Sequence, residues 1–214
     1  MYQDLTNGFN TISIENPIWG MVYDNEGSKL IIDSRDEKTR EIQLLELEID
    51  PLNCKSIPVK LSWYERLLAI IDNELYAVKY EDQNDPSQFS FQKLNIISGA
   101  KSVVKSVPSF EVNLTEPSFF DVGTKHHKTV SEFLSIDLVF PCEYLEIENN
   151  IIISYYLRSE KGLDRFLLCI RDGENVWRIR QDHQMNGFAS GAFFASNRRL
   201  FFVKERNEVC IYSF

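Results

Sequence analysis

Residues 19–49, WGMVYDNEGSKLIIDSRDEKTREIQLLELEI, decide the fold that the sequence predicts. Three short apolar runs are separated here by two polar turns. The first turn, residues 24–27, ends in a glycine that can adopt a positive φ, and the second is the charged segment 35–40. Polar and apolar residues alternate in the last run. The stretch therefore predicts three antiparallel strands in a meander rather than a strand–helix–strand unit.

The same pattern recurs downstream with a period near 45 residues. Trp63 follows Trp19 by 44 residues, a third copy begins at Tyr144 and a fourth at Phe188. Three or four strands in such a period are typical of the blades of a β-propeller. A β-sandwich built from the same meanders is the alternative.

One segment, residues 101–140, does not follow the period. It is expected to hold a partial blade, with strands at 103–107, 110–114 and 136–140 and one or two helical turns at 129–135. We predict that residues 1–214 form a single all-β domain of four to five blade-like repeats.

Composition agrees with this fold class. Hydrophobic residues make up 43% of the 214 residues and aromatic residues 13%, and aromatic and β-branched side chains favour strands. The net charge of −9 argues against nucleic acid and anionic membranes as partners, because both attract clustered Lys and Arg. The four cysteines, Cys54, Cys142, Cys169 and Cys210, are widely spaced and predict reduced thiols, with a Cys169–Cys210 bridge as the alternative.

The N-terminal sequence MYQDLTNGFN has neither the basic nor the apolar region of a signal peptide. No apolar run approaches the 18 residues or so that a membrane-spanning helix needs. A cytoplasmic protein is therefore expected. The sequence leaves the oligomeric state open.

Arginines and tryptophans recur with the repeat. Arg35, Arg158 and Arg206 each end a predicted strand at the same offset and suggest a ring of guanidinium groups for an acidic ligand. The simpler interpretation is an ion pair with a neighbouring carboxylate, which would be Asp36, Glu160 or Glu208. Trp19 and Trp63 suggest an exposed aromatic platform, against the simpler interpretation that they fill the space between two sheets.

Catalytic and metal-binding motifs have little support. No GxSxG, GxxxxGK[ST] or GxGxxG pattern occurs. His126 and His127 are adjacent, and adjacent side chains on a strand point to opposite faces, so a charged loop at 123–128 is favoured over a metal site. The acidic loop 81–85 is predicted to be a solvated turn rather than a Ca²⁺ site. No cofactor, metal or catalytic residue is predicted.

Several segments carry a resemblance to a known family. These are KLIIDSRDEKTRE at 29–41, ELYAVKYEDQNDP at 74–86, EYLEIENNIIISYYLR at 143–158 and RRLFFVKERNEVCIY at 198–212. Together they resemble a family of uncharacterised bacterial proteins, mainly from the Bacteroidetes group, that is classed as a domain of unknown function. The resemblance implies a repetitive all-β fold with no assigned activity, and it supplies no catalytic residues.

Three hypotheses about function follow. The first is a non-enzymatic scaffold that binds a protein or peptide, and it would be contradicted by a deep polar funnel with buried carboxylates of raised pKa. The second is a carbohydrate-binding or glycoside-processing protein that uses Trp19, Trp63 and the abundant carboxylates. The third, a metal-dependent enzyme around His126 and His127, requires a third ligand nearby.

Overall fold

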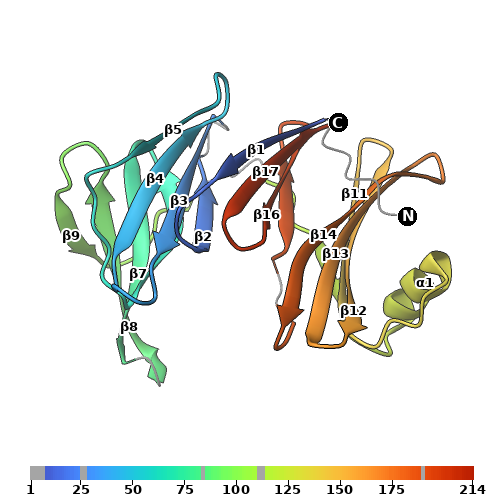
Figure 1. Cartoon of the computed structure of the whole chain (residues 1–214). Helices are drawn as coiled ribbons and strands as arrows, with labels where there is room; N and C mark the ends of the chain where they lie inside the picture. Colours follow the sequence, from blue (N-terminus) through green and yellow to red (C-terminus); the bar gives the residue numbers. More distant parts are fainter. Residues whose placement is uncertain (1–7, 25–27, 83–84, 110–113, 189–190) are drawn as a thin grey trace. The chain divides into compact units, whose positions relative to one another are not determined.

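The computed structural model describes residues 8–24, 28–82, 85–109, 114–188 and 191–214, and strands dominate them. The strands form four antiparallel sheets, and a single α-helix is present in the described residues. The predicted all-β class is confirmed. The chain divides into two compact units, Ile14–Asn113 and Met1–Ser13 together with Leu114–Phe214. We call these the first unit and the second unit (Figure 1).

The first unit consists of two four-stranded meanders. The first meander contains β2 (Ile18–Tyr23), β3 (Lys29–Arg35), β4 (Ile42–Glu48) and β5 (Asn53–Ser56) in that order. The second contains β6 (Glu65–Ile71), β7 (Glu74–Asp82), β8 (Asp85–Asn95) and β9 (Lys101–Val104). The three strands predicted from residues 19–49 correspond to β2, β3 and β4.

One core joins the two meanders of the first unit. Ile31 and Leu44 from the first sheet pack with Leu75 and Leu94 from the second, and all four are almost completely buried. Side chains alternate between the two faces of a strand, so every second residue of β3 points into this core. The same alternation brings Asp33 and Arg35 to the face that carries Ile31.

The second unit also has two sheets. One contains β10 (Ser118–Phe120), β11 (Cys142–Ile147), β12 (Asn150–Ser159), β13 (Gly162–Arg171) and β14 (Glu174–Met185). The other contains β15 (Phe193–Ser196), β16 (Arg199–Lys204), β17 (Glu208–Ser213) and, at its edge, β1 (Phe9–Ser13). The N-terminal strand β1 therefore completes the C-terminal sheet by antiparallel pairing with β17.

Tight turns with two left-handed residues recur in both units. Asp72 and Asn73 have φ values of 50° and 61°, and Glu148 and Asn149 have values of 45° and 61°. Two consecutive positive φ values are typical of the two-residue type I′ turn of a hairpin, and Asn and Asp tolerate them best.

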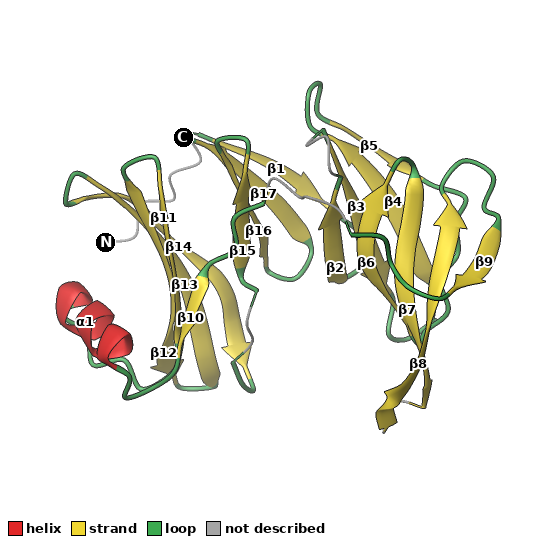
Figure 2. Cartoon of the chain, turned by 180° about the vertical axis from the view of Figure 1, so that it is seen from behind, coloured by secondary structure: helices red, strands yellow, loops and turns green. Residues whose placement is uncertain are grey.

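The segment expected to hold a partial blade contains the helix α1 (Lys125–Leu134), which lies against the five-stranded sheet (Figure 2). Val130 and Leu138 pack there with Ile153 and Phe166. Two expectations change accordingly. Residues 125–128 of the expected loop form the start of α1, with Thr124 as its N-cap, and residues 136–140 are not a strand. Most of the strand expected at 110–114 lies outside the described residues. Ile136 and Leu138 of this range are apolar because they pack with Val130 of α1 in the same cluster.

The four cysteines are free, and Cys142, Cys169 and Cys210 are buried. Cys169 and Cys210 share one core cluster without being bridged. Burial raises the pKa of each of these three thiols to about 11. Among the described residues, no helix combines the length and the apolar character that crossing a membrane requires.

Candidate functional site

Arg35, one of the predicted binding residues, is completely buried at the end of β3. Its guanidinium forms two parallel bonds with the carboxylate of Asp33, from Nε to Oδ1 at 2.8 Å and from Nη2 to Oδ2 at 2.6 Å. Nη1 also donates to the carbonyl oxygen of Trp63 at 2.8 Å, and Nη2 to that of Glu65 at 2.5 Å. Arg35 therefore connects the first sheet of the first unit to the start of β6.

Two indole rings flank this buried guanidinium. Trp19 and Trp63 meet edge to face with their ring centroids 5.3 Å apart, and Cζ of Arg35 lies 5.3 Å from the centroid of Trp19 and 5.5 Å from that of Trp63. Arg40 lies over Trp63 at 4.5 Å and Arg66 over Trp19 at 5.1 Å. Three guanidinium groups and two indoles thus form one cation–π cluster.

Part of this cluster reaches the surface. The Trp19 side chain is 37% exposed, the neighbouring Tyr64 is 47% exposed, and Trp63 is half-buried. The tryptophans are therefore neither a fully buried wedge nor a bare platform. We call Trp19, Arg40, Trp63, Tyr64 and Arg66 the Trp19–Trp63 surface.

Local backbone features position the members of this surface. The register of β2 against β3 shifts between Ile18 and Gly20, so Trp19 is the extra residue of a β-bulge. Bulges bend a strand and redirect a side chain. The turn that carries Arg40 is held by Asp36, whose carboxylate accepts the backbone N–H of Lys38 at 2.7 Å. That bond is the main reason why the pKa of Asp36 is lowered.

The Trp19–Trp63 surface carries uncompensated positive charge. The carboxylate of Asp33 is occupied by Arg35. Within the described ranges of the chain, neither Arg40 nor Arg66 forms an ion pair. Burial lowers the pKa of Arg66, and the positive charge of Arg35 lowers it further.

The other two predicted arginines lie in the second unit and in different surroundings. Arg158 is exposed near the end of β12, with Cζ 5.5 Å from the ring centroid of Phe140. Arg206 is exposed in the turn after β16, with a φ of 65°. Only Arg35 of the three is buried, and its carboxylate partner is Asp33 rather than Asp36. A shared arginine face stays a prediction.

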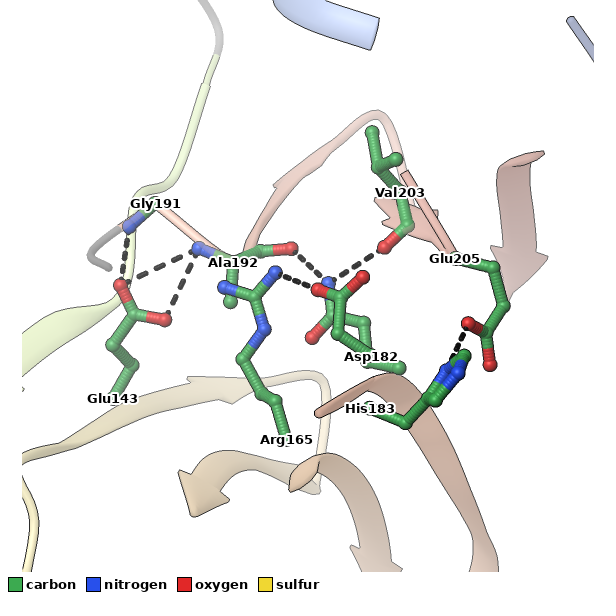
Figure 3. Close-up of polar contacts among 9 residues, drawn as sticks. Glu143, Arg165, Asp182, His183, Gly191, Ala192, Val203 and Glu205 are labelled. Carbon is green, nitrogen blue, oxygen red and sulfur yellow. Dashed lines mark hydrogen bonds and ion pairs between the residues drawn. The ribbon is translucent and has the colours of Figure 1, made fainter. Parts of the chain in front are cut away.

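Sequence reasoning did not identify a second polar group, which lies between the two sheets of the second unit (Figure 3). Glu143 on β11 is buried, and its carboxylate accepts the backbone N–H groups of Gly191 at 2.5 Å and of Ala192 at 3.1 Å. The Gln181 side chain of β14 donates to the carbonyl oxygens of Ala192 at 2.7 Å and of Val203 at 2.9 Å. These bonds attach β11 and β14 to the beginning of β15 and to β16.

A buried ion pair lies beside these bonds. Arg165 on β13 pairs with Asp182 on β14, and Figure 3 shows its guanidinium between the carboxylates of Glu143 and Asp182. Burial raises the pKa of both carboxyl groups, and the charge of Arg165 opposes that rise in each case. A sequence signal existed, because Glu143 has the strand parity of Leu145, and Arg165 that of Leu167, so each charge falls on an apolar face.

We expect stability to fall as the pH rises through the range where Glu143 ionises. Its folded-state pKa lies above the ordinary value of 4.5, so the folded chain binds the proton more tightly than the unfolded chain does. This contribution is fully present below the unfolded pKa and is lost as the pH rises through the folded one. Urea unfolding followed by circular dichroism between pH 5 and 8 measures it.

The control for this pH dependence is Glu143→Gln, which cannot ionise. Its unfolding free energy should vary less steeply with pH than that of the wild type. Asp36, Glu48 and Asp85, whose pKa values are lowered, lose their contributions only at more acidic pH and so leave this window undisturbed. Equal slopes for the two proteins would contradict the assignment.

The two adjacent histidines diverge. His126 stacks on Phe120 with ring centroids 5.0 Å apart, whereas His127 is buried with Nε2 2.8 Å from the carbonyl oxygen of Phe140. A carbonyl oxygen can only accept, so His127 donates through Nε2. Over the described part of the chain, no three His, Cys, Asp or Glu side chains are grouped to hold a metal ion.

Comparison with known proteins adds little. No protein-family model matches the chain, and none of the curated proteins matches its sequence. Among solved structures, an acylaminoacyl peptidase in complex with Z-Gly-Gly-Phe-chloromethyl ketone aligns with 92% of this chain at 13% identity, with a TM-score of 0.28. This chain spans only 31% of that peptidase chain, and a similarity this low carries no argument. Membership of the uncharacterised bacterial family stays a prediction.

Proposed function

We propose that this protein is a non-enzymatic scaffold that binds a protein or peptide partner through the Trp19–Trp63 surface. The observation that carries this proposal is the partly exposed Trp19, next to the exposed Tyr64, with arginines placed over the two indole rings. Tryptophan, tyrosine and arginine are the residues that contribute most binding energy at protein interfaces. Their positions are fixed before binding, which reduces the entropy lost on association.

A propeller-like arrangement is part of the proposal. Three of the four sheets keep their strands in chain order, and β1 completes the fourth sheet by pairing with β17. Meanders of about four strands, with an N-terminal strand that closes the last one, support the propeller interpretation over a sandwich of crossed connections.

The two buried carboxylates of raised pKa, Glu143 and Asp182, both have partners within the second unit. Glu143 is engaged by the backbone N–H groups of Gly191 and Ala192, and Asp182 by Arg165. General acid–base catalysis needs a carboxyl group within reach of a substrate proton. The raised pKa of each group follows from its burial between the two sheets, and each has a structural role there.

Carbohydrate binding is the second candidate, and the 37% exposure of the Trp19 side chain favours it. A sugar usually stacks on an open aromatic face. Each indole of the Trp19–Trp63 surface already has two guanidinium groups within 5.5 Å of its ring centre. This occupation favours a peptide, which can bind through the arginines as well as through the ring edges.

Free thiols suggest where the protein works. All four cysteines are free, and burial raises the pKa of each, to about 11 for Cys142, Cys169 and Cys210, which keeps the thiols protonated. We propose a reducing compartment such as the cytoplasm. Labelling the native protein with iodoacetamide should modify Cys54 ahead of the three buried thiols.

Selection from a random 12-residue peptide library tests the proposed function. Peptides recovered with the wild type should bind Trp19→Ala and Tyr64→Ser at least 30-fold more weakly, because interface hot spots contribute about 2 kcal/mol or more. Phe133→Ala is the matched control, since Phe133 is a 51% exposed aromatic residue of the second unit. Selected peptides that bind all variants equally, or glycans that bind through Trp19 when no peptide does, would refute the proposal.

A further inference from the structure

We infer that the partner of the Trp19–Trp63 surface is an acidic peptide segment, whose carboxylates pair with Arg40 and Arg66. This inference rests on the binding function proposed above and specifies the chemistry of the ligand. It comes from two features of the surface, its unpaired positive charge and the way in which its guanidinium groups are held.

The surface is positively charged although the chain as a whole has 32 acidic residues and only 23 basic ones. Some exposed cations of the chain are paired with carboxylates, as Arg198 is with Glu148 at 2.9 Å and Lys55 with Glu46 at 2.9 Å. Arg40 and Arg66 have no such partner among the described residues, although both lie at one aromatic surface. Guanidinium groups recognise carboxylates through pairs of parallel hydrogen bonds.

Both guanidinium groups are held in place before any ligand binds. Nη1 of Arg66 donates to the carbonyl oxygens of Trp63 at 2.8 Å and Glu65 at 2.9 Å while the group lies over Trp19. Arg40 lies over Trp63, and the turn that carries it is closed by hydrogen bonds to Asp36. A carboxylate would therefore meet preorganised donors.

Arg66 is partly buried. Desolvation is the main cause that lowers the pKa of its guanidinium, the charge of Arg35 lowers it further, and Asp33 opposes both. A carboxylate placed against it would restore the lost stabilisation of that charge. The carboxylate of Asp33, which acts on Arg66, bonds through both of its oxygens to Arg35.

Other anions fit these observations less well. Nucleic acid would face the repulsion of a chain with a net charge of −9 and would find only two arginines here. An acidic sugar would compete with the guanidinium groups for the indole faces. A peptide can instead place its backbone along Tyr64 and Trp19 and extend its carboxylates to the arginines.

The backbone conformation of Arg40 allows its side chain to be removed without disturbing the turn. Its φ is 63°, in the left-handed region that glycine favours. Arg40→Gly therefore removes the guanidinium without straining the turn, and the variant should be at least as stable as the wild type. Arg66→Gln is less clean, because Arg66 also bonds to two backbone carbonyls.

The experiment uses the full chain and the peptide pool selected on it. Asp and Glu should be enriched in that pool, and replacing them with Asn and Gln in a synthetic peptide should weaken binding about tenfold for each carboxylate that pairs with an arginine. Arg40→Gly should also weaken the acidic peptide about tenfold. Arg40→Gly should hardly change the affinity for the neutral peptide. The control Arg198→Gln, which removes an exposed arginine of the second unit, should change the affinity for neither the acidic nor the neutral peptide.

The outcomes separate this inference from the proposed function. A pool that depends on Trp19 and Tyr64 but is not acidic, or that binds Arg40→Gly as tightly as the wild type, overturns the acidic ligand and leaves the binding surface standing. A pool whose binding does not depend on Trp19 and Tyr64 overturns both the proposed binding surface and the acidic ligand. Oligogalacturonate is the third probe, and its binding through Arg40 without any acidic peptide binding would overturn the peptide in favour of an acidic sugar.

Discussion

Replacing Arg35 with methionine is expected to lower the unfolding free energy of the first unit by about 3–5 kcal/mol. Arg35 is completely buried, and it holds the carboxylate of Asp33 through two hydrogen bonds. Without the guanidinium, Asp33 remains as a buried and uncompensated charge. The carbonyl oxygens of Trp63 and Glu65 keep a donor, because Arg66 also bonds to both. The cost therefore comes mainly from the isolated carboxylate.

The double variant Asp33→Leu/Arg35→Met isolates that cause. Removing both charges replaces the buried pair with apolar groups, which is often nearly neutral. We expect it to recover most of the stability that Arg35→Met loses. Urea unfolding in a Trp177→Phe background provides the measurement, because Trp19 and Trp63 then report on the first unit alone. A double variant as unstable as the single one would show that packing, rather than the unpaired charge, dominates.

Replacing Phe202 with alanine is expected to cost about 3–5 kcal/mol in the second unit. The Phe202 ring is buried in the core that the two sheets share. Its centroid lies 5.9 Å from that of Phe9 on β1 and 6.5 Å from that of Trp177 on β14. The alanine variant leaves a cavity where three segments distant in sequence meet. Both lost transfer free energy and lost packing contribute to the cost.

Trp177 fluorescence in a Trp19→Phe/Trp63→Phe background measures this change during urea unfolding. Phe133→Ala is the control, because its ring is half-exposed on α1 and its loss should change stability by about 0.5 kcal/mol or less. Phe202→Ala should also loosen β1, whose Phe9 packs on the same cluster. If Phe202→Ala were no more destabilised than the control, the shared core would not hold the sheets together.

The hairpins were predictable from the sequence because their determinants are local. The alternation in residues 42–49 and the apolar run at 30–32 needed only their neighbours to be interpreted, and β3 and β4 form there. The turn residues Asp72 and Asn73 also carry their conformational preference with them. The repeat period then allowed the later meanders, whose sequence patterns are less regular, to be predicted from the first one.

The helix α1 and the residues after it were predicted less well, for a physical reason. A short amphipathic segment has little intrinsic stability, and α1 forms because Val130 packs against the five-stranded sheet. The apolar residues at 136–140 alternate like a strand, but Ile136 and Leu138 pack in the same cluster. Local pattern cannot distinguish burial in a sheet from burial beneath a helix.

In the candidate site, too, the sequence identified some residues but not the contacts between them. Trp19, Arg35 and Trp63 were identified from their recurrence, yet nothing local shows that Arg35 is buried between two indoles while Arg158 and Arg206 are exposed. Arg40 and Arg66 were not identified at all. Arg66 joins the surface because β2 and β6 lie side by side, where Asp24 bridges to Ile70. Arg40 joins it because the turn before β4 brings its guanidinium over Trp63.

By itself, the sequence determined the all-β class, the meanders and their turns, since these depend on side-chain alternation and on backbone preferences within a few residues. Only the tertiary structure decided which distant segments meet. It paired β1 with β17 across nearly the whole chain, gave Arg35 the partner Asp33 and brought Glu143 to Gly191 and Ala192. Such contacts depend on the free energy of the packed whole, because each becomes favourable only when water is excluded from all the groups around it.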